Sequence, residues 1–65
     1  MTIDEVRERV ENIKASVDDD EAAHGQEDTL WENVLKAVAR GDKDGPALAA
    51  EALKTRDIDF ARWRA

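Results

Sequence analysis

The residues best suited to carry chemistry stand together around the single histidine of the chain. Glu21 and His24 are three residues apart, and Glu27 and Asp28 follow three and four residues after the histidine. Residues at these spacings share one face of a helix. Di-iron bundle proteins use the same Glu-x-x-His spacing on two helices, with glutamates from two more. The spacing allows a metal site of Glu21, His24 and Glu27, completed by a symmetric dimer. The interpretation that we favour is a solvated or helix-capping histidine, because Gly25 beside it makes a poor rigid platform for ligands.

Other catalytic arrangements are missing from the sequence. There is no cysteine and no tyrosine, and the few hydroxyl side chains stand in no nucleophile-elbow or triad-like sequence. The three glycines are scattered and form no phosphate-binding loop. One histidine in so short a chain leaves little room for an acid–base pocket. We therefore expect no enzymatic activity and no cofactor.

The size of the chain predicts one domain, residues 1–65, that benefits from association. A single core in a chain below roughly 70–80 residues usually needs help from disulfides, a metal or another chain. Without cysteine, neither a disulfide nor a zinc–thiolate site can supply that help. Regular helix packing or association with a partner remains, so a homo-oligomer is one expectation.

The charge of the chain excludes several classes of partner. Lys and Arg number 10 against 16 Asp and Glu, a formal net charge of −6. Nucleic acids and anionic membrane surfaces both bind cationic groups, so neither is an expected direct partner. The sequence has no basic region followed by an apolar run and no apolar stretch of about 18 residues. We therefore expect a cytoplasmic protein.

The acidic residues are concentrated in the first half of the chain. Residues 1–33 carry a net charge of −8, and residues 34–65 carry +2. This asymmetry fits two copies that attract each other, or an acidic helix that folds against the chain's own basic end. Acids on the outer faces of the helices form either a solvated surface or a mimic of a phosphate row.

The first predicted helix spans residues 3–17 and has the most regular pattern in the chain. Thr2 and Glu5 form a capping box, in which each side chain satisfies a free backbone N–H of the first turn. Branched apolar residues then recur at alternating spacings of three and four, the seam of a paired or bundled helix: Ile3, Val6, Val10, Ile13 and Val17. This stripe packs either on the chain's own second helix, or on a second copy or a foreign helix.

The second predicted helix spans residues 21–40. Three aspartates before it suit the positive end of a helix dipole, and Gly41 suits the residue that follows its end. Gly25 lowers the helix propensity by about 1 kcal/mol relative to alanine, so residues 18–26 are either helix or linker. The apolar residues of this helix share one broad face: Ala23, Leu30, Trp31, Val34, Leu35, Ala37 and Val38.

The third predicted helix spans residues 46–55, and a short helical turn is expected over residues 58–64. Pro46 suits the first turn of the third helix, because a backbone N–H at this position would have no hydrogen-bond partner within the helix. The apolar residues of this helix include several alanines, which allow close approach to another helix: Leu48, Ala49, Ala52 and Leu53. No segment alternates apolar and polar residues over a useful length, so we expect no strand.

Aromatic residues near the end of the chain are candidates for a binding surface. Phe60 and Trp63 are three residues apart and share a face if residues 58–64 form a helical turn. Arg62 lies between them, and tryptophan and arginine dominate the centres of binding interfaces. Trp63 is therefore either a clamp on the bundle or an anchor for a partner, whereas Trp31 is expected to be a core or edge residue of the second helix.

Several stretches between residues 19 and 63 resemble a known group of proteins. The stretches are residues 19–24, 27–30, 34–41, 52–55 and 58–63. Together they resemble small uncharacterised acidic proteins of actinobacteria and mycobacteriophages. The resemblance covers roughly residues 19–65, and it implies such a source, a cytoplasmic setting and an accessory role in binding a host protein. It implies no functional residue.

The sequence thus predicts an all-α fold, either a small three-helix bundle or a helical hairpin with a short C-terminal helix, with dimerisation left open. The first two helices are expected to pack antiparallel, and the third closes the bundle. The expected function is a protein-interaction module; a metal-binding bundle and an acidic mimic of nucleic acid are the alternatives. The residues expected to contact the partner are Val6, Val10, Ile13, Phe60, Arg62 and Trp63.

Overall fold

Three α-helices make up most of residues 1–62, the part of the chain that the computed structural model describes. Helix α1 spans Ile3–Ala15, α2 spans Asp20–Ala39 and α3 spans Gly45–Leu53. A 3₁₀ segment, η1, continues directly from α3 over Lys54–Asp57. No strand occurs within these 62 residues. The prediction of an all-α fold is therefore confirmed.

Side-chain caps begin the first two helices. The Thr2 hydroxyl accepts a hydrogen bond from the Glu5 backbone N–H at 3.1 Å, and the Asp19 carboxylate accepts one from the Ala22 N–H at 3.1 Å. Each bond satisfies one of the donors that a first helical turn leaves free. Helix α3 has no side-chain cap and carries Pro46 in its first turn instead.

The boundaries of α1 and α2 differ by a few residues from those predicted. Helix α1 ends two residues early, where the Ser16 hydroxyl donates to the Asn12 carbonyl oxygen at 2.9 Å. Helix α2 begins at Asp20 and continues through Gly25, so most of the segment left open between helix and linker is helix. Gly41 follows α2 with a φ of 85°, a left-handed conformation that glycine adopts at little cost.

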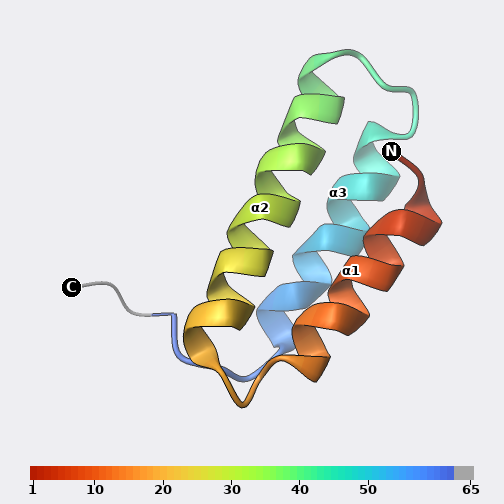
Figure 1. Ribbon diagram of the computed structural model, residues 1–65. Coiled ribbons are helices and arrows are strands. Elements are labelled where there is room, and N and C mark those ends of the chain that lie inside the picture. The colour runs from red at the N-terminus through yellow and green to blue at the C-terminus, as the bar shows by residue number, and fades with distance from the viewer. Residues whose placement is uncertain (63–65) are drawn as a thin grey trace.

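Residues 58–62, which we call the strap, do not form the predicted helical turn. Ile58 leaves η1 in an extended conformation, with φ −81° and ψ 125°. The strap then crosses to the start of α2, where the Ala61 N–H donates to the Asp20 carboxylate at 3.2 Å (Figure 1). Extended backbone places residues two apart on the same side, so that Ile58 and Phe60 are both buried, whereas a helical turn would separate them.

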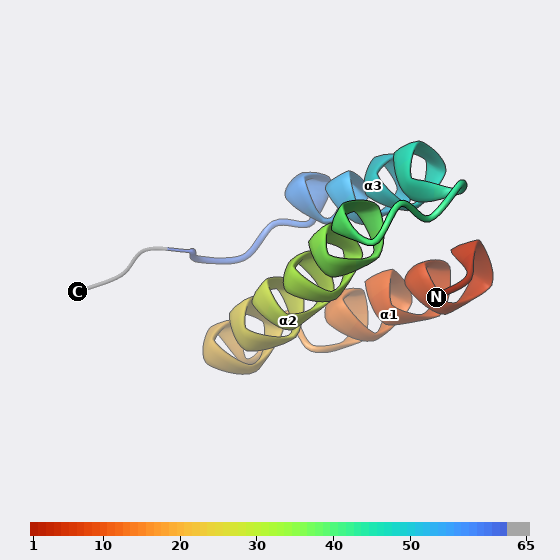
Figure 2. The same cartoon turned by 90° about the horizontal axis from the view of Figure 1, so that it is seen from above.

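The helices run in alternating directions around one core. Helix α2 is antiparallel to α1, as predicted, and α3 returns alongside both (Figure 1). Each helix contacts the other two, and the view from above shows them around a common interior (Figure 2). The buried apolar residues come from all three helices and the strap: Val6, Val10, Ile13, Ala23, Leu30, Val34, Ala37, Leu48, Ala52, Ile58 and Phe60.

Candidate functional site

The structure does not bring the predicted metal ligands together. Glu27 is only 5% exposed, and its carboxylate oxygens Oε1 and Oε2 accept hydrogen bonds from Arg62 Nε at 2.9 Å and Nη2 at 3.1 Å. Glu21 is exposed, and His24 Nε2 lies 3.5 Å from Asp28 Oδ1. Within residues 1–62 no group of three metal-ligating side chains is placed to hold an ion. This corrects the expectation of a site at Glu21, His24 and Glu27: six residues along a helix turn Glu27 away from Glu21 and into the core.

Arg62 is the centre of a polar cluster that holds the strap in place. Its Nη2 donates to the carbonyl oxygens of Thr55 at 2.7 Å and Ile58 at 2.9 Å, in addition to the carboxylate of Glu27. The guanidinium also lies over the Phe60 ring, 3.8 Å from its centroid. One side chain therefore satisfies the carbonyl groups that are freed where η1 ends and connects them to α2.

Glu27 and Arg62 form a charged pair. Burial by itself would raise the pKa of the Glu27 carboxyl group, because a charge is less stable away from water. Hydrogen bonds from Arg62 and Thr55, together with the positive charge of Arg62, outweigh that effect and lower the pKa below its ordinary value of 4.5. The hydrogen bond to Glu27 in turn raises the pKa of Arg62.

Trp31 is joined to this pair through Thr55. The indole Nε1 donates to the Thr55 hydroxyl at 3.0 Å and to the Ala52 carbonyl oxygen at 3.2 Å. The Thr55 hydroxyl, which is fully buried, hydrogen-bonds to Glu27. Among residues 1–62 no buried side-chain nitrogen or oxygen lacks a partner, as stable interiors require. The ring of Trp31 is therefore held in a fixed position between α2 and α3.

The heptad stripe of α1 lies inside the bundle. Val6 and Ile13 are fully buried, Val10 is nearly so, and Ile3 and Val17 pack against the ends of the core. The stripe thus packs on the chain's own α2 and α3, one of the two alternatives that the sequence allowed. This corrects the expectation that Val6, Val10 and Ile13 contact a partner, because the folded chain leaves Val6 and Ile13 no exposed surface and Val10 only 5% of its own.

The residues proposed for a contact at the end of the chain also serve the fold. Phe60 is buried in the core, and the hydrogen bonds of Arg62 are made to groups of the same chain. Trp63 lies outside the described residues. Phe60 and Arg62, the two proposed contact residues that the structure describes, therefore make their contacts within the molecule.

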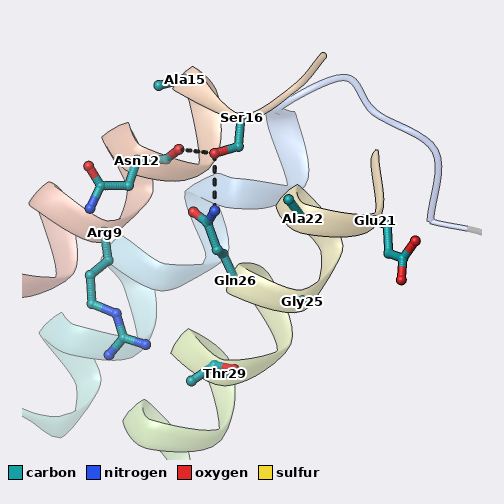
Figure 3. A pocket seen from close by; sticks show the side chains of 9 residues that line it. All are labelled: Arg9, Asn12, Ala15, Ser16, Glu21, Ala22, Gly25, Gln26 and Thr29. Carbon is teal, nitrogen blue, oxygen red and sulfur yellow. Dashed lines mark hydrogen bonds between the residues drawn. The ribbon is translucent and has the colours of Figure 1, made fainter. Parts of the chain in front are cut away.

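A polar groove runs between α1 and the first half of α2 (Figure 3). Near one end the Ser16 hydroxyl donates to the Asn12 carbonyl oxygen and accepts a hydrogen bond from the Gln26 amide at 3.0 Å. Arg9 lines the groove farther along α1, and Glu21 lines it from the first turn of α2 (Figure 3). These side chains bridge two helices and do not form an acid–base pair.

An apolar groove lies between α2 and α3. It is lined entirely by apolar side chains: Trp31, Val34, Leu35, Ala49, Ala52 and Leu53. We call this surface, together with the neighbouring Val38, the α2–α3 apolar face. The volume of the groove is about 140 Å³, below the 300–1,000 Å³ of pockets that bind small molecules. Its size suits an inserted side chain.

The exposed large apolar side chains among residues 1–62 gather on this face. Leu35 is 66% exposed, Leu53 is 53% exposed and Val38 is 42% exposed, and residues 1–62 expose no other large apolar side chain. Single exposed apolar residues are common on protein surfaces, whereas contiguous ones mark contact sites. The α2–α3 apolar face is therefore the candidate functional site.

The acidic surface of α1 is interrupted by basic residues. Arg7 lies 3.8 Å from Asp4, and Lys14 lies 3.0 Å from Glu11, in ion pairs within the helix. A second contact joins Arg7 to Glu51 of α3 at 3.4 Å. The mixture of signs is typical of a solvated helix surface, so the structure adds nothing in favour of a mimic of nucleic acid.

The apolar residues of the α2–α3 apolar face belong to the broad pattern seen in residues 21–40. That pattern alone does not distinguish the exposed residues from those buried in the core. Adjacent residues of a helix point about 100° apart, so Val34 and Leu35 are not both directed at one neighbouring helix. The apolar face predicted for residues 21–40 was therefore too broad to be buried completely. Which of its members stay exposed depends on where α3 packs: Val34 is buried, whereas Leu35, which lines the groove beside α3, is 66% exposed.

No helix within residues 1–62 is long and apolar enough to cross a membrane. Comparison with protein-family models, with curated proteins and with solved structures gave no match.

Proposed function

We propose that this protein is a protein-interaction module and that the α2–α3 apolar face is its contact surface. One observation supports the proposal: three exposed apolar side chains, those of Leu35, Val38 and Leu53, lie together on one face. Removal of apolar surface from water contributes about 25 cal/mol per Å² to association. A partner that covers this face therefore gains this free energy from side chains that the fold already holds in position.

The shape of the face fits an apolar helix surface of a partner protein. Leu35 on α2 and Leu53 on α3 rise on either side of a groove whose other lining residues include two alanines. Side chains of a helix insert into grooves of this kind when helices pack. Trp31, fixed by its bonds to Thr55 and Ala52, supplies the type of rigid aromatic residue that binding hot spots contain.

The biological setting follows from the resemblance stated for the sequence. A source in actinobacteria or their phages places the protein in the cytoplasm and makes a host protein the expected partner. In that setting the protein is an accessory factor that acts by binding. These points stay predictions, and they do not affect the choice of the contact surface.

Site-specific cross-linking tests the proposed contact surface. A photoreactive amino acid replaces Leu35 in one variant and Thr29 in the matched control, which is exposed on the opposite side of α2. In actinobacterial cells we expect a discrete cross-linked product from position 35 and none from position 29. Leu53→Asp in the same chain should reduce that product severalfold. Equal products from both positions, or none from position 35, would contradict the proposal.

A further inference from the structure

We propose that the strap regulates the α2–α3 apolar face: the face has the shape that fits a partner while the strap is docked, and it loses that shape when the strap opens. The inference rests on the proposed function, because it concerns the regulation of the same contact surface. Three observations carry it: the strap and the face share Thr55, a 3₁₀ segment connects them, and few bonds hold the strap.

Thr55 connects the strap to the ring of Trp31. Arg62 Nη2 donates to the Thr55 carbonyl oxygen at 2.7 Å, so the strap holds the backbone of this residue. The Thr55 hydroxyl donates its one proton to the Glu27 carboxylate and accepts the indole N–H of Trp31 at 3.0 Å. Glu27 is in turn held by Arg62. Arg62 therefore fixes Thr55 by two routes, and Thr55 fixes a ring that lines the groove.

The segment that carries Thr55 also ends the helix that forms the other wall of the groove. Ala52 and Leu53, which line the groove, are the last two residues of α3, and η1 begins at the next residue. Hydrogen bonds of a 3₁₀ segment have poorer geometry than those of an α-helix, so η1 is easier to unwind. Opening of the strap removes the bond from Arg62 that stabilises η1. Trp31 on one wall of the groove and Leu53 on the other are then less firmly held.

The strap can open while the helices stay folded. Two of its hydrogen-bond contacts reach α2, the Ala61 N–H to a carboxylate at the start of that helix and Arg62 to Glu27. Its buried apolar side chains are those of Ile58 and Phe60, whereas the other buried apolar residues belong to the helices. A segment with so few contacts opens at a smaller cost in free energy than the whole fold. The strap is therefore an element with a docked and an open state, as the regulation of a second site requires.

The coupling acts in both directions. A partner seated against Trp31 and Leu53 restricts both side chains, and through them it stabilises Thr55 and the docked strap. The docked strap raises the affinity for the partner by the same factor by which the partner favours docking, because the two equilibria are linked.

Hydrogen exchange of the Trp31 indole N–H, followed by NMR, tests the link between the strap and the ring. A Trp63→Phe background leaves Trp31 as the one tryptophan of the chain, so that its indole signal is identified directly. Arg62→Lys keeps the charge but loses the bidentate contact with Glu27, and it should speed this exchange by about fivefold, the factor that one lost hydrogen bond is worth. Arg56→Lys, the same change at an exposed arginine of η1, should leave the rate near its native value.

Urea separates opening of the strap from unfolding of the whole chain. Local opening exposes little surface, so low concentrations of urea should leave the exchange of the Trp31 indole N–H unchanged. The backbone amide of Val10, in the middle of α1, exchanges through unfolding of the bundle, and its rate should rise with urea. An indole rate that rises in parallel with that of Val10, or one that Arg62→Lys does not change, would overturn the inference.

The role of Thr55 as the connection is tested by two substitutions at that position. Thr55→Val removes the hydroxyl, whereas Thr55→Ser keeps it and is the matched control. Arg62→Lys should speed the exchange of the Trp31 indole much less in the Thr55→Val background than in the Thr55→Ser background, because the two changes break one pathway. An equal effect of Arg62→Lys in both backgrounds would show that the strap does not act through the Thr55 hydroxyl.

Cross-linking from position 35 tests the effect on the partner and separates this inference from the function on which it rests. The product should fall severalfold in Arg62→Lys and stay at its native level in Arg56→Lys, with circular dichroism showing that both variants are folded. An undiminished product in Arg62→Lys overturns the regulation and leaves the proposed contact surface intact. No product from position 35 in the otherwise native chain overturns both proposals, even where the exchange measurements connect the strap to Trp31.

Discussion

The Arg62 guanidinium binds both carboxylate oxygens of Glu27, a residue 35 positions earlier in the chain. This pair fastens the strap to the first half of α2 and is connected through Thr55 to the indole of Trp31. A polar cluster therefore positions Trp31, which lines the α2–α3 apolar face. The stability of the fold and the shape of that surface depend on the same few side chains.

Loss of the Arg62 side chain should destabilise the fold. Arg62→Ala leaves Glu27 buried without its partner, which we expect to cost about 1–2 kcal/mol after allowance for the partial exposure of the arginine. The melting temperature should fall by roughly 5–10 °C in a domain of this size. Arg56→Ala, which removes an exposed arginine from η1, is the matched control and should change little. Equal melting temperatures for the two variants would show that the Arg62–Glu27 pair adds no stability.

Acid should weaken the same pair. The pKa of Glu27 is lower in the folded chain than its ordinary value of 4.5, so the unfolded chain takes up a proton first as the pH falls. The stabilising contribution of the pair is therefore complete above pH 4.5 and is lost as the pH drops through the folded pKa. Glu27→Gln should lower the melting temperature at about pH 7 and make a smaller difference at about pH 3. Glu8→Gln, at an exposed position of α1, is the control, and a Glu27→Gln effect that does not shrink in acid would contradict the assignment.

Two glycines should respond to alanine in opposite directions. Gly25 lies inside α2, and a methyl group there would meet no other side chain or segment within 4 Å, so Gly25→Ala should stabilise the fold by about 0.5–1 kcal/mol. Gly41 has a φ of 85°, and Gly41→Ala should destabilise the fold by about 1 kcal/mol. Chemical denaturation of both variants measures the two changes. A loss of stability in Gly25→Ala would mean that α2 bends at that residue.

The contribution of Trp31 to the stability of the fold should depend on its indole N–H as well as on its ring. Trp31→Phe keeps an aromatic ring but removes the donor to Thr55 and Ala52, at an expected cost of about 1 kcal/mol. Thr55→Val removes the hydroxyl from the other side of the same bond. In a double-mutant cycle the two changes should be clearly non-additive, because they remove one shared interaction. Additive losses would show that the bond contributes nothing in solution.

Local signals accounted for most of the fold. The capping Thr2, the alternating spacings of α1 and the terminating Gly41 act within one or two helical turns, so a single sequence reveals them. The burial of Val10 follows from the same periodicity. The antiparallel order of α1 and α2 follows from the short connection between them.

Contacts between distant segments were beyond the reach of these patterns. Glu27 looked like a ligand beside His24, because nothing in its neighbourhood points to an arginine in the strap. Alternation over Ile58, Phe60 and Arg62 is the pattern of extended backbone, but it is too short to outweigh a helical spacing of three. The candidate site was missed for the same reason: the exposure of Leu35 depends on where α3 packs against α2, which the local pattern does not reveal.

The position of Arg62 in the chain also fixes the order in which the protein can be completed during synthesis. Every group that Arg62 binds, from the Glu27 carboxylate to the Ile58 carbonyl, is translated before it. The helices can form their local hydrogen bonds as they leave the ribosome, since chains fold progressively from the N-terminus. The buried carboxylate stays without its partner until Arg62 has emerged from the exit tunnel. A nascent chain whose Arg62 is still inside the exit tunnel is therefore a less stable, more open form of the protein than the released chain.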